Sequence, residues 1–426
     1  MLDLKAIRAD YEGARDALAR RADAGVLDEL DACLALDDRR RDLIGRVEVL
    51  KARRNEVSRL IGERRGRGEQ AEDEISDMRE VGEQIRALDA ELAEVRSRLD
   101  EGLLRLPNLP DARVPPGGED DYEIVAEHGE VGEGGKPATA HWDLGERLGA
   151  LDLERGARIA GSGFPLLWGA GARLARGLVD FMLDLHTAEH GYVEVSPPYL
   201  VNRASLTATG HLPKYEEDVY RTAADDLFLV PTAEVPLTNL HRDEILAEAD
   251  LPLAYVAYTP CFRREAGAAG RDTRGLLRVH QFDKVELVRF CAPNESEAEL
   301  ELLTRHAEVV LQRLELPYRR ILLAAGDLGF ANAITYDLEV WSAGVGRWLE
   351  VSSCSSYTDY QARRAGIRFR PAVGGGTRFV HTLNGSGVAL ARTIVALLEN
   401  NQEADGGVRI PAALQPYVRA ERLDPP

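Results

Sequence analysis

The segment between residues 261 and 287 concentrates side chains that bind anions. Five arginines stand from Arg263 to Arg278, against the two acids Glu265 and Asp272, around a Gly/Ala-rich centre. Planar guanidinium groups bind phosphate and carboxylate through paired hydrogen bonds. Because a partly buried arginine needs a counter-ion, the pattern favours an anionic ligand here. The alternative is structural, with Glu265 neutralising one of the arginines.

Apparent strands at 253–263 and 276–291 flank this centre and predict a hairpin with a long loop. The first and last arginines are expected on the strands, whereas Arg271 and Arg274 are expected in the loop. The hairpin would then present cations both along its strands and at its tip.

A second stretch, LVPTAEVPLTN (229–239), places Glu234 among apolar and hydroxyl side chains. An acid in this setting either caps a helix or receives the ammonium group of a ligand. Taken alone, the stretch favours the structural interpretation.

A third stretch, YDLEVWSAGVGRWLEVSSCSSYTDYQARR (336–364), carries Glu339 and Glu350 near the expected ends of two strands. A carboxylate beside an arginine-rich sheet is well placed to hold Mg²⁺ against phosphate oxygens. The alternative is an ion pair to Arg347 or Arg363.

A fourth stretch, HTLNGSGVALARTIVALLENNQ (381–402), predicts a strand, a tight Asn-Gly-Ser-Gly turn and then a helix. Arg392 is expected in the second turn of that helix. The helix start can bind an anion, and the arginine can stack on a planar ring. By itself the stretch indicates only the beginning of a helix.

The first hundred residues have a different periodicity from the rest of the chain. Apolar residues recur there at alternating spacings of three and four, on both sides of GRGEQ (66–70). They are Leu36, Leu43, Leu50, Val47, Val57 and Ile61 before it, and Ile75, Met78, Val81, Ile85, Leu88, Leu92, Val95 and Leu99 after it. This spacing predicts two helices paired as an antiparallel hairpin about 50 Å long, on a base of shorter helices before Leu36.

Charge on the first of these helices is strongly positive. Between residues 39 and 67 there are eleven Lys/Arg and four Asp/Glu, although the whole chain has a formal net charge of -19. The hairpin is either a dimerisation device with a solvated charged face or a grip for a polyanion. The local excess of arginine favours the polyanion.

A proline- and glycine-rich stretch at 106–121 ends the helical pattern and marks a linker. Beyond it, strand candidates follow one another with few helices between them. They lie at 192–201, 227–230, 253–263, 276–291, 318–325, 336–341, 348–353 and 378–383, with helices at 172–191 and 388–401. We expect an α+β fold with a mixed or antiparallel sheet rather than a doubly wound one.

Composition bounds the class of protein. The chain is 44% hydrophobic and 29% charged, as in globular domains, and has no apolar run long enough to span a bilayer. Its beginning has no apolar signal core. The four cysteines are far apart and form no CxxC pair, so we expect no structural zinc, no disulfide framework and a cytoplasmic location.

Together the motifs resemble a known family almost from end to end. TAEVPLTN, FRREAG…DTRGLLRVHQFDKVE, EVSSCS…DYQARR and LNGSGVALARTIVALLEN occur in family-like order and spacing. The chain resembles the bacterial-type seryl-tRNA synthetases, which are class II aminoacyl-tRNA synthetases. The resemblance implies a tRNA-binding helical domain with a long coiled-coil arm at 1–106, a linker at 107–125 and a catalytic domain at 126–426. That domain would have a mostly antiparallel sheet flanked by helices.

The resemblance also implies roles for individual residues. Serine would bind at Thr232, Ala233, Glu234, Glu286 and Ser386. ATP would bind at Arg263, Arg264, Glu265, Val279, Glu350, Val351, Ser352, Ser353 and Arg392. Arg263 and Arg392 would also act electrostatically in catalysis, and Glu350 would meet the Mg²⁺ that accompanies ATP. The tRNA would contact Arg53, Arg54, Arg64, Arg271 and Arg274.

The implied activity is the activation of L-serine with ATP and the transfer of serine to tRNA(Ser), and to tRNA(Sec) where that tRNA is present. The resemblance also implies a homodimer with residues 172–201 at its interface. The chain departs from the family pattern at Arg264, and at Ser356 and Tyr357, where Asn-Cys is common. Two alternatives remain: a pathway-dedicated or carrier-protein-charging paralogue, and a non-catalytic coiled-coil scaffold. The helical arm counts against the carrier-protein enzyme, because such relatives generally lack it. The intact charged residues count against the scaffold.

Overall fold

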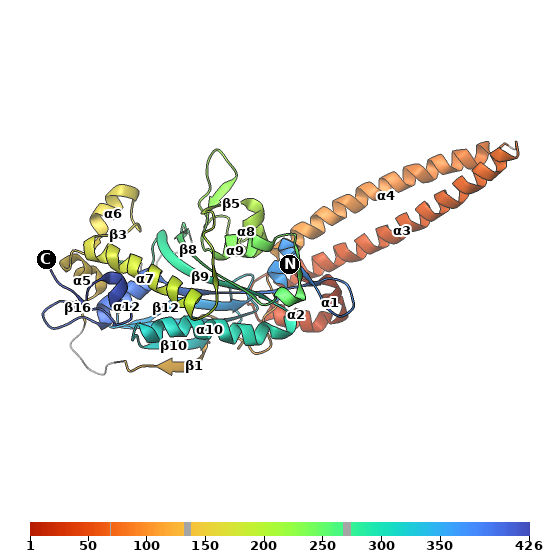
Figure 1. The fold of residues 1–426 in the computed structure, drawn as a ribbon. Helices are drawn as coiled ribbons and strands as arrows, with labels where there is room; N and C mark the ends of the chain where they lie inside the picture. The colour runs from red at the N-terminus through yellow and green to blue at the C-terminus, as the bar shows by residue number, and fades with distance from the viewer. Residues whose placement is uncertain (69, 132–137, 267–273) are drawn as a thin grey trace. The chain divides into compact units, whose positions relative to one another are not determined.

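The computed structural model describes the chain except residue 69 and residues 132–137 and 267–273, and its described residues form two compact units (Figure 1). One unit comprises Leu2–Ala19 and Asp23–Pro107. The other comprises Met1, Arg20–Ala22 and Asn108–Pro426. The first is entirely helical, and the second is built around a large sheet.

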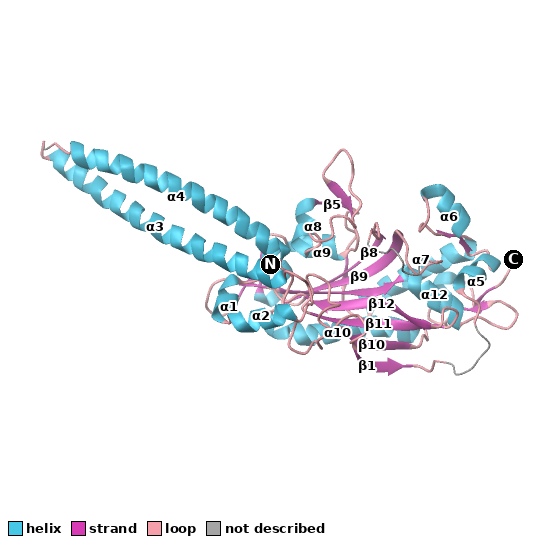
Figure 2. Ribbon diagram, turned by 180° about the vertical axis from the view of Figure 1, so that it is seen from behind, coloured by secondary structure: helices cyan, strands magenta, loops and turns pink. Residues whose placement is uncertain are grey.

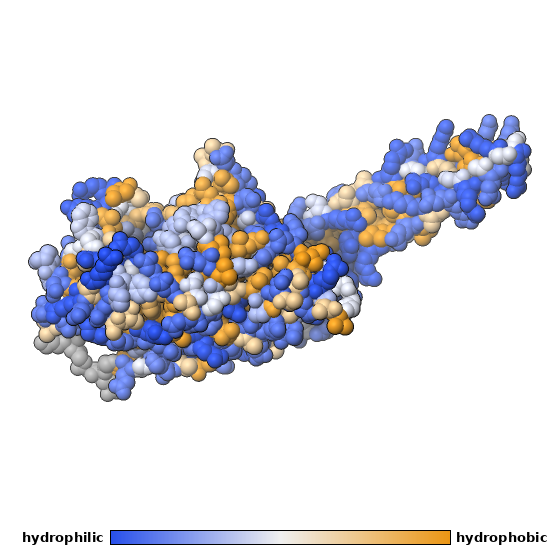
Figure 3. All heavy atoms as spheres, in the orientation of Figure 1, coloured by the Kyte–Doolittle hydropathy of each residue, from blue (hydrophilic) through white to orange (hydrophobic). Residues whose placement is uncertain are grey.

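A long helical hairpin dominates the first unit. Helices α3 (Val26–Gly66) and α4 (Glu72–Arg105) run antiparallel. Their buried contact contains Leu43, Val47, Leu88, Leu92 and Val95. At 1.5 Å per residue α3 is about 60 Å long and α4 about 50 Å, and the predicted hairpin is confirmed. On the face visible in Figure 3 its surface is mostly hydrophilic.

The base of the hairpin differs from the prediction. Two short helices are present, α1 (Leu4–Ala9) and α2 (Tyr11–Ala19), but α3 begins well before Leu36. The buried stripe continues backward through Cys33 and Leu30 at the same spacing, so the helix continues with it.

An eight-stranded sheet forms the centre of the second unit (Figure 2). Its strands, in spatial order, are β1 (Glu123–His128), β10 (Tyr318–Leu322), β11 (Ile334–Ser342), β12 (Arg347–Ser356), β15 (His381–Ala389), β9 (Gln281–Cys291), β8 (Leu253–Phe262) and β4 (Val193–Glu194). Every neighbouring pair is antiparallel except β4 and β8. The expected antiparallel α+β architecture is therefore confirmed.

Helices cover the sheet and complete its core. The longer ones are α7 (Gly169–Ala188), α10 (Ser296–Arg313) and α12 (Leu390–Asn400). The shorter ones are α5 (His141–Arg147), α6 (Leu153–Ala160), α8 (Arg203–Thr209), α9 (Glu234–Thr238), α11 (Tyr360–Ala365) and α13 (Gln415–Val418), with 3₁₀ turns at Asn239–His241, Glu248–Asp250 and Pro293–Glu295. Helix α10 packs on β12 and β15, and α12 packs on β9 and β11.

Four small sheets extend the unit at its edges. They pair β2 (Leu151–Asp152) with β3 (Leu166–Leu167), β5 (Leu200–Asn202) with β6 (Leu227–Leu229), and β16 (Val408–Arg409) with β17 (Arg422–Leu423). The fourth contains β7 (Ile245–Ala247), β13 (Arg368–Arg370) and β14 (Arg378–Phe379). The sheet of β5 and β6 stands beside α8 and α9 (Figure 2).

Two local predictions were wrong. Strand β8 ends at Phe262 and β9 begins only at Gln281, so Arg263 and Arg278 lie beyond the strand ends. One backbone hydrogen bond, from the Arg263 N–H to the His280 carbonyl at 2.9 Å, still joins the two segments. The ladder stops there because the His280 N–H donates to Gly163 at 2.9 Å and not back to Arg263.

The predicted Asn-Gly-Ser-Gly turn is part of strand β15, with a register shift between Ser386 and Val388. The glycine at 385 serves close packing, because a Cβ there would lie 2.4 Å from the side chain of Leu303 and 2.9 Å from Cys354. Helix α12 therefore begins at Leu390, which places Arg392 in its first turn rather than its second.

Candidate active site

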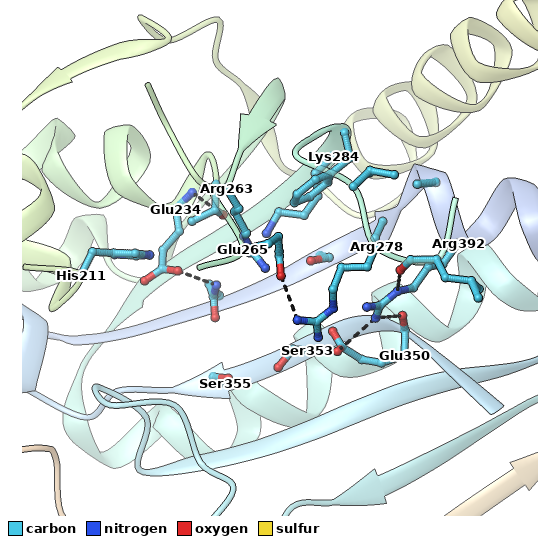
Figure 4. A pocket seen from close by; sticks show the side chains of 18 of the residues that line it. His211, Glu234, Arg263, Glu265, Arg278, Lys284, Glu350, Ser353, Ser355 and Arg392 are labelled. Carbon is cyan, nitrogen blue, oxygen red and sulfur yellow. Dashed lines mark hydrogen bonds and ion pairs between the residues drawn. The ribbon is translucent and has the colours of Figure 1, made fainter. Parts of the chain in front are cut away.

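A cavity of 290 Å³ opens on the face of the central sheet that α10 does not cover (Figure 4). Asn384 and Ser386 line the cavity, whereas Gly385 between them faces Leu303 of α10. Successive residues of a strand point to opposite faces, so β15 separates the cavity from that helix. Side chains from β9, β12, β15, α9 and α12 meet in this cavity.

One end of the cavity holds two buried carboxylates. Glu286 on β9 and Glu234 at the start of α9 both accept hydrogen bonds from the Asn384 amide nitrogen, at 2.8 and 3.1 Å. Lys284 lies 2.7 Å from the second oxygen of Glu286, and Gln361 donates to the second oxygen of Glu234 at 2.6 Å. Each carboxylate oxygen therefore has a defined partner.

Two like charges this close and this deeply buried are costly to ionise together. Burial and the charge of Glu286 raise the pKa of Glu234 to about 7, while the Gln361 hydrogen bond opposes this shift. Nearby His211 is half-buried, and the loss of solvent around its imidazole lowers its pKa to about 3, so it stays neutral. A bound cation would favour the ionised form of Glu234.

The other end of the cavity is rich in arginine. Arg278 donates to Glu265 at 2.8 Å, and Arg392 in the first turn of α12 lies 3.3 Å from the carboxylate of Glu350. Figure 4 shows these two ion pairs side by side, away from Glu234 and His211. Arg263 stacks its guanidinium over Phe282, 5.2 Å from the ring centre.

The backbone at Glu265 has a strained conformation that hydrogen bonds to Asp218 hold in place. Glu265 has a φ of 52°, in the left-handed region that non-glycine residues avoid. Asp218 holds this turn, because its carbonyl oxygen accepts from Arg264 at 2.8 Å and its carboxylate from Ala266 at 2.9 Å. Strain that the surroundings maintain in this way is typical of functional sites.

The arrangement suits two ligands that meet between its ends. A small molecule with an ammonium group and a hydroxyl matches the carboxylate end, and an anion such as a phosphate matches the arginines. The face of Phe282 offers a stacking surface for a planar ring.

Comparison with known proteins agrees with this chemistry. A model of the seryl-tRNA synthetase N-terminal domain matches residues 1–110, and a model of the tRNA synthetase class II core domain (G, H, P, S and T) matches residues 215–401. The "Serine--tRNA ligase" of Gemmatimonas aurantiaca is 54% identical over 98% of both chains, and that of an Exiguobacterium species is 52% identical over the whole of both.

The chain belongs to the seryl-tRNA synthetase family. Its structure also resembles that of the seryl-tRNA synthetase from Pyrococcus horikoshii complexed with ATP, with a TM-score of 0.96, 38% identity and full coverage of both chains. The Naegleria fowleri cytoplasmic enzyme in complex with AMP matches with a TM-score of 0.86 at 28% identity, over 97% of this chain and 96% of that one. The resemblance inferred from the motifs is confirmed.

Most residues to which the family resemblance assigns serine or ATP binding line the cavity. These are Thr232, Glu234, Arg263, Glu265, Val279, Glu350, Ser353, Ser386 and Arg392. Glu286 lies directly behind the lining, where the Ser386 hydroxyl donates to it at 3.3 Å. These contacts bring the residues together, while their individual roles stay predictions.

Four other predicted residues direct their side chains elsewhere. Ala233 and Val351 pack in the hydrophobic core, and Arg264 is exposed. Ser352 donates its hydroxyl to the backbone oxygen of Ser386 at 2.6 Å. A role for Ala233 or Val351 in ligand binding would therefore use backbone atoms.

Sequence reasoning missed several lining residues. Lys284 and Asn384 each stand two residues before a predicted serine-binding residue on the same strand, so the strand period of two could have identified them. His211 and Tyr357 lie in connections between elements, where no periodicity indicates direction.

The residues predicted to contact tRNA differ in their exposure and in their interactions. Arg53 and Arg54 are exposed on α3, and Arg64 forms an ion pair with Glu74 of α4. Arg274 lies over the ring of Trp142 at 4.2 Å. Arg271 lies outside the described residues.

Three general findings complete the description. Within the parts of the chain that the structure describes, no group of three or more His, Cys, Asp or Glu side chains is arranged to hold a metal ion. All four cysteines are buried with free thiols. No helix in the described ranges combines the length and apolar character that a bilayer crossing requires.

Proposed function

We propose that the chain activates L-serine with ATP to form seryl-adenylate and transfers the seryl group to the 3′ end of tRNA(Ser), and of tRNA(Sec) where that tRNA is present. The observation that carries the proposal is the cavity with paired buried carboxylates at one end and arginines at the other. Family membership supports it.

The residue chemistry suits such an activation step. Glu234 receives the serine ammonium group, and Glu286 together with Ser386 receives the hydroxyl. Arg263 binds the serine carboxylate and the α-phosphate of ATP, which reduces repulsion as the carboxylate oxygen attacks the α-phosphorus and pyrophosphate leaves. Arg392 packs on the adenine, and Glu265 and the Val279 backbone hold it. Phe282, on the arginine side of the cavity, offers the opposite ring face.

The donor set fits a magnesium ion that accompanies ATP. Glu350 and Ser353 both line the cavity and supply the oxygen ligands that Mg²⁺ prefers. Glu350 is about half exposed, so a metal bound there keeps access to phosphate oxygens. The ion would neutralise phosphate charge, and its other ligands would come from ATP and water.

Selectivity for serine follows from the buried acids. An amino acid that lacks the hydroxyl, such as alanine, cannot give buried Glu286 the hydrogen bond that the serine hydroxyl donates, and losing a buried polar contact costs much more than a missing methylene group. Because the pKa of Glu234 is raised to about 7, serine binding is expected to weaken as the pH falls below 7.

We assign residues 1–106 to tRNA binding, 107–125 to a linker and 126–426 to catalysis, and propose that the protein acts as a cytoplasmic homodimer. Large apolar side chains within 172–201 support an interface there, because Val193, Tyr199 and Leu200 are exposed. Size-exclusion chromatography with light scattering tests the dimer, and Val193→Asp is expected to shift it toward monomer.

ATP–pyrophosphate exchange across a panel of amino acids tests the activation step. Serine should support exchange far better than alanine, threonine or glycine, and charging of tRNA(Ser) transcripts should follow. A chain dedicated to a carrier protein would show serine exchange without tRNA charging. Absence of exchange with every amino acid would refute the proposal.

The arm is tested separately. Deleting residues 40–95 should spare exchange and abolish tRNA charging, and Arg53→Ala/Arg54→Ala should raise the KM for tRNA. Arg79→Ala/Arg86→Ala, which removes exposed arginines from α4, is the matched control. Equal effects of the two pairs would contradict a specific grip on α3.

A further inference from the structure

A tyrosine lies buried beneath the carboxylate end of the cavity. Tyr357 follows strand β12, and its hydroxyl donates to the Asn384 side-chain oxygen at 2.8 Å. Its backbone N–H donates to Thr382 at 3.0 Å, and its backbone oxygen accepts from Asn108 at 2.8 Å. Tyr357 is therefore held both at its hydroxyl and at its backbone. It stands at a position where the chain departs from the family pattern.

The hydroxyl determines which way the Asn384 amide points. A side-chain amide has its acceptor and its donors on opposite sides. Because Tyr357 donates to the oxygen, the nitrogen faces the two carboxylates and donates to both Glu286 and Glu234, at 2.8 and 3.1 Å. One amide thus sets the spacing between the two acids.

The remaining oxygens of the acids are held from other directions. Lys284 and Ser386 contact the second oxygen of Glu286 at 2.7 and 3.3 Å. Gln361 donates to Glu234 and itself accepts from the Thr382 hydroxyl at 2.7 Å. Among the residues that the structure describes, only the Asn384 amide bonds to both acids, so its orientation affects them together.

Electrostatics favours this direction of donation. Burial and the two nearby carboxylates raise the pKa of Tyr357 well above its usual value, so the hydroxyl keeps its proton. The Tyr357 hydroxyl in turn lowers the pKa of Glu234, against the larger upward effects of burial and Glu286. Loss of the hydroxyl is therefore expected to make Glu234 harder to ionise.

We propose that Tyr357 is a positioning residue for amino-acid recognition: by fixing the Asn384 amide it holds Glu234 and Glu286 at the separation that the ammonium and hydroxyl groups of the substrate need. This rests on the proposed function, in which those two acids receive serine. Tyr357 acts on the amino acid through Asn384 and leaves the arginine end unchanged.

Tyr357→Phe removes only the hydroxyl and tests this role. In ATP–pyrophosphate exchange the KM for serine should rise about tenfold, the scale of one buried hydrogen bond, with the KM for ATP unchanged within about twofold. Tyr318→Phe is the matched control, because Tyr318 is buried and its hydroxyl accepts from Gln312 at 2.7 Å outside the cavity. It should change neither KM.

A pH profile separates positioning from a general loss of stability. The acidic limb of kcat/KM for serine should move to higher pH in Tyr357→Phe, because Glu234 then ionises less readily, and should stay in place in the control. An unchanged serine KM, or equal rises in the KM for serine and for ATP, would overturn the inference.

A double-mutant cycle gives a second readout. Asn384→Ala should weaken serine binding more than Tyr357→Phe does, and Tyr357→Phe added to it should cause a much smaller loss than it causes in the wild type. Additive effects would overturn the inference. Wild-type protein without serine-dependent exchange would refute the proposed function and this inference together, whereas active wild type with an unaffected Tyr357→Phe variant refutes the inference alone.

Discussion

The helical hairpin and the sheet-centred unit handle electric charge in opposite ways. On the hairpin, pairs such as Arg39–Glu91 and Lys51–Asp89 have side chains that are 40–45% exposed. At the cavity, Lys284 and Glu286 are 8% and 0% exposed. Exposed pairs contribute little to stability, whereas breaking a buried pair leaves an uncompensated charge. Exposed ion pairs on the hairpin can be exchanged for contacts with a partner at little cost, while buried charge near the cavity fixes geometry.

The largest effect is expected where buried charge meets the substrate. Glu286→Ala leaves Lys284 without its partner and removes the acceptor of the serine hydroxyl. Serine-dependent exchange should fall by about 1,000-fold in kcat/KM, equivalent to roughly 4 kcal/mol. Steady-state exchange kinetics measure this change.

Glu299→Ala is the matched control for Glu286→Ala. It breaks another buried pair, with Arg289, outside the cavity. It should lower the unfolding temperature without a selective change in the KM for serine. Near-normal exchange in Glu286→Ala would remove that residue from the proposed site.

One charged residue of the hairpin, Asp37, is buried like those at the cavity and is expected to stabilise the fold as they do. Asp37 on α3 is fully buried and pairs with Arg40 at 2.6 Å and with Arg8, whereas the neighbouring Asp38 is exposed. Asp37→Ala should destabilise the base of the hairpin by about 3 kcal/mol, and Asp38→Ala by less than about 1 kcal/mol. Hydrogen exchange of α3 amides distinguishes them, and equal protection in both variants would contradict the distinction.

A buried histidine cluster in the sheet-centred unit is expected to make its stability depend on pH. His190 stacks on His306 at 4.0 Å and hydrogen-bonds to His186 at 2.9 Å. Burial lowers the pKa of His186 and of His306 to about 3, and for His306 the charges of His190, Arg289 and Arg305 act in the same direction.

The sign follows from proton binding. The unfolded chain binds these protons near pH 6.5 and the folded one does not, so stability is full above pH 6.5 and is lost on acidification toward pH 3. The slope should approach about 1.4 kcal/mol per pH unit for each histidine between these pKa values. His306→Gln should flatten it in pH-dependent unfolding, whereas the exposed His128→Gln should not. Identical slopes would show that the cluster does not titrate on unfolding.

The smallest effect is expected on the surface of the hairpin. Arg39→Ala removes the pair with Glu91 and should cost about 0.5 kcal/mol, with even less lost at high salt. Hydrogen exchange of α3 and α4 measures it. A loss as large as that of Asp37→Ala would mean that exposed charge also stabilises this unit.

Part of the site was predictable because its signals are local. The arginines around 263–278 indicate an anionic ligand by their type, and Glu350 a Mg²⁺ site, whereas the roles of Glu234 and Glu286 follow from the resemblance of their motifs to the family. The exact strand ends were not predictable, because His280 is held by Gly163, a residue far from it in sequence. The β15 glycines resemble a turn in sequence, but close packing requires them: a Cβ at Gly385 would meet Leu303 of α10, and one at Gly387 would meet His186 of α7.

The sequence by itself determined the helical hairpin, the antiparallel α+β class and the family, because periodicity and motif spacing are properties of neighbouring residues. Only the tertiary structure decided that one amide bonds both acids and that Tyr357 orients it. Glu286 and Glu234 lie 98 and 150 residues from Asn384 along the chain. Hydrogen-bond direction and burial at such separations arise only when the strands and connections that carry these residues pack together.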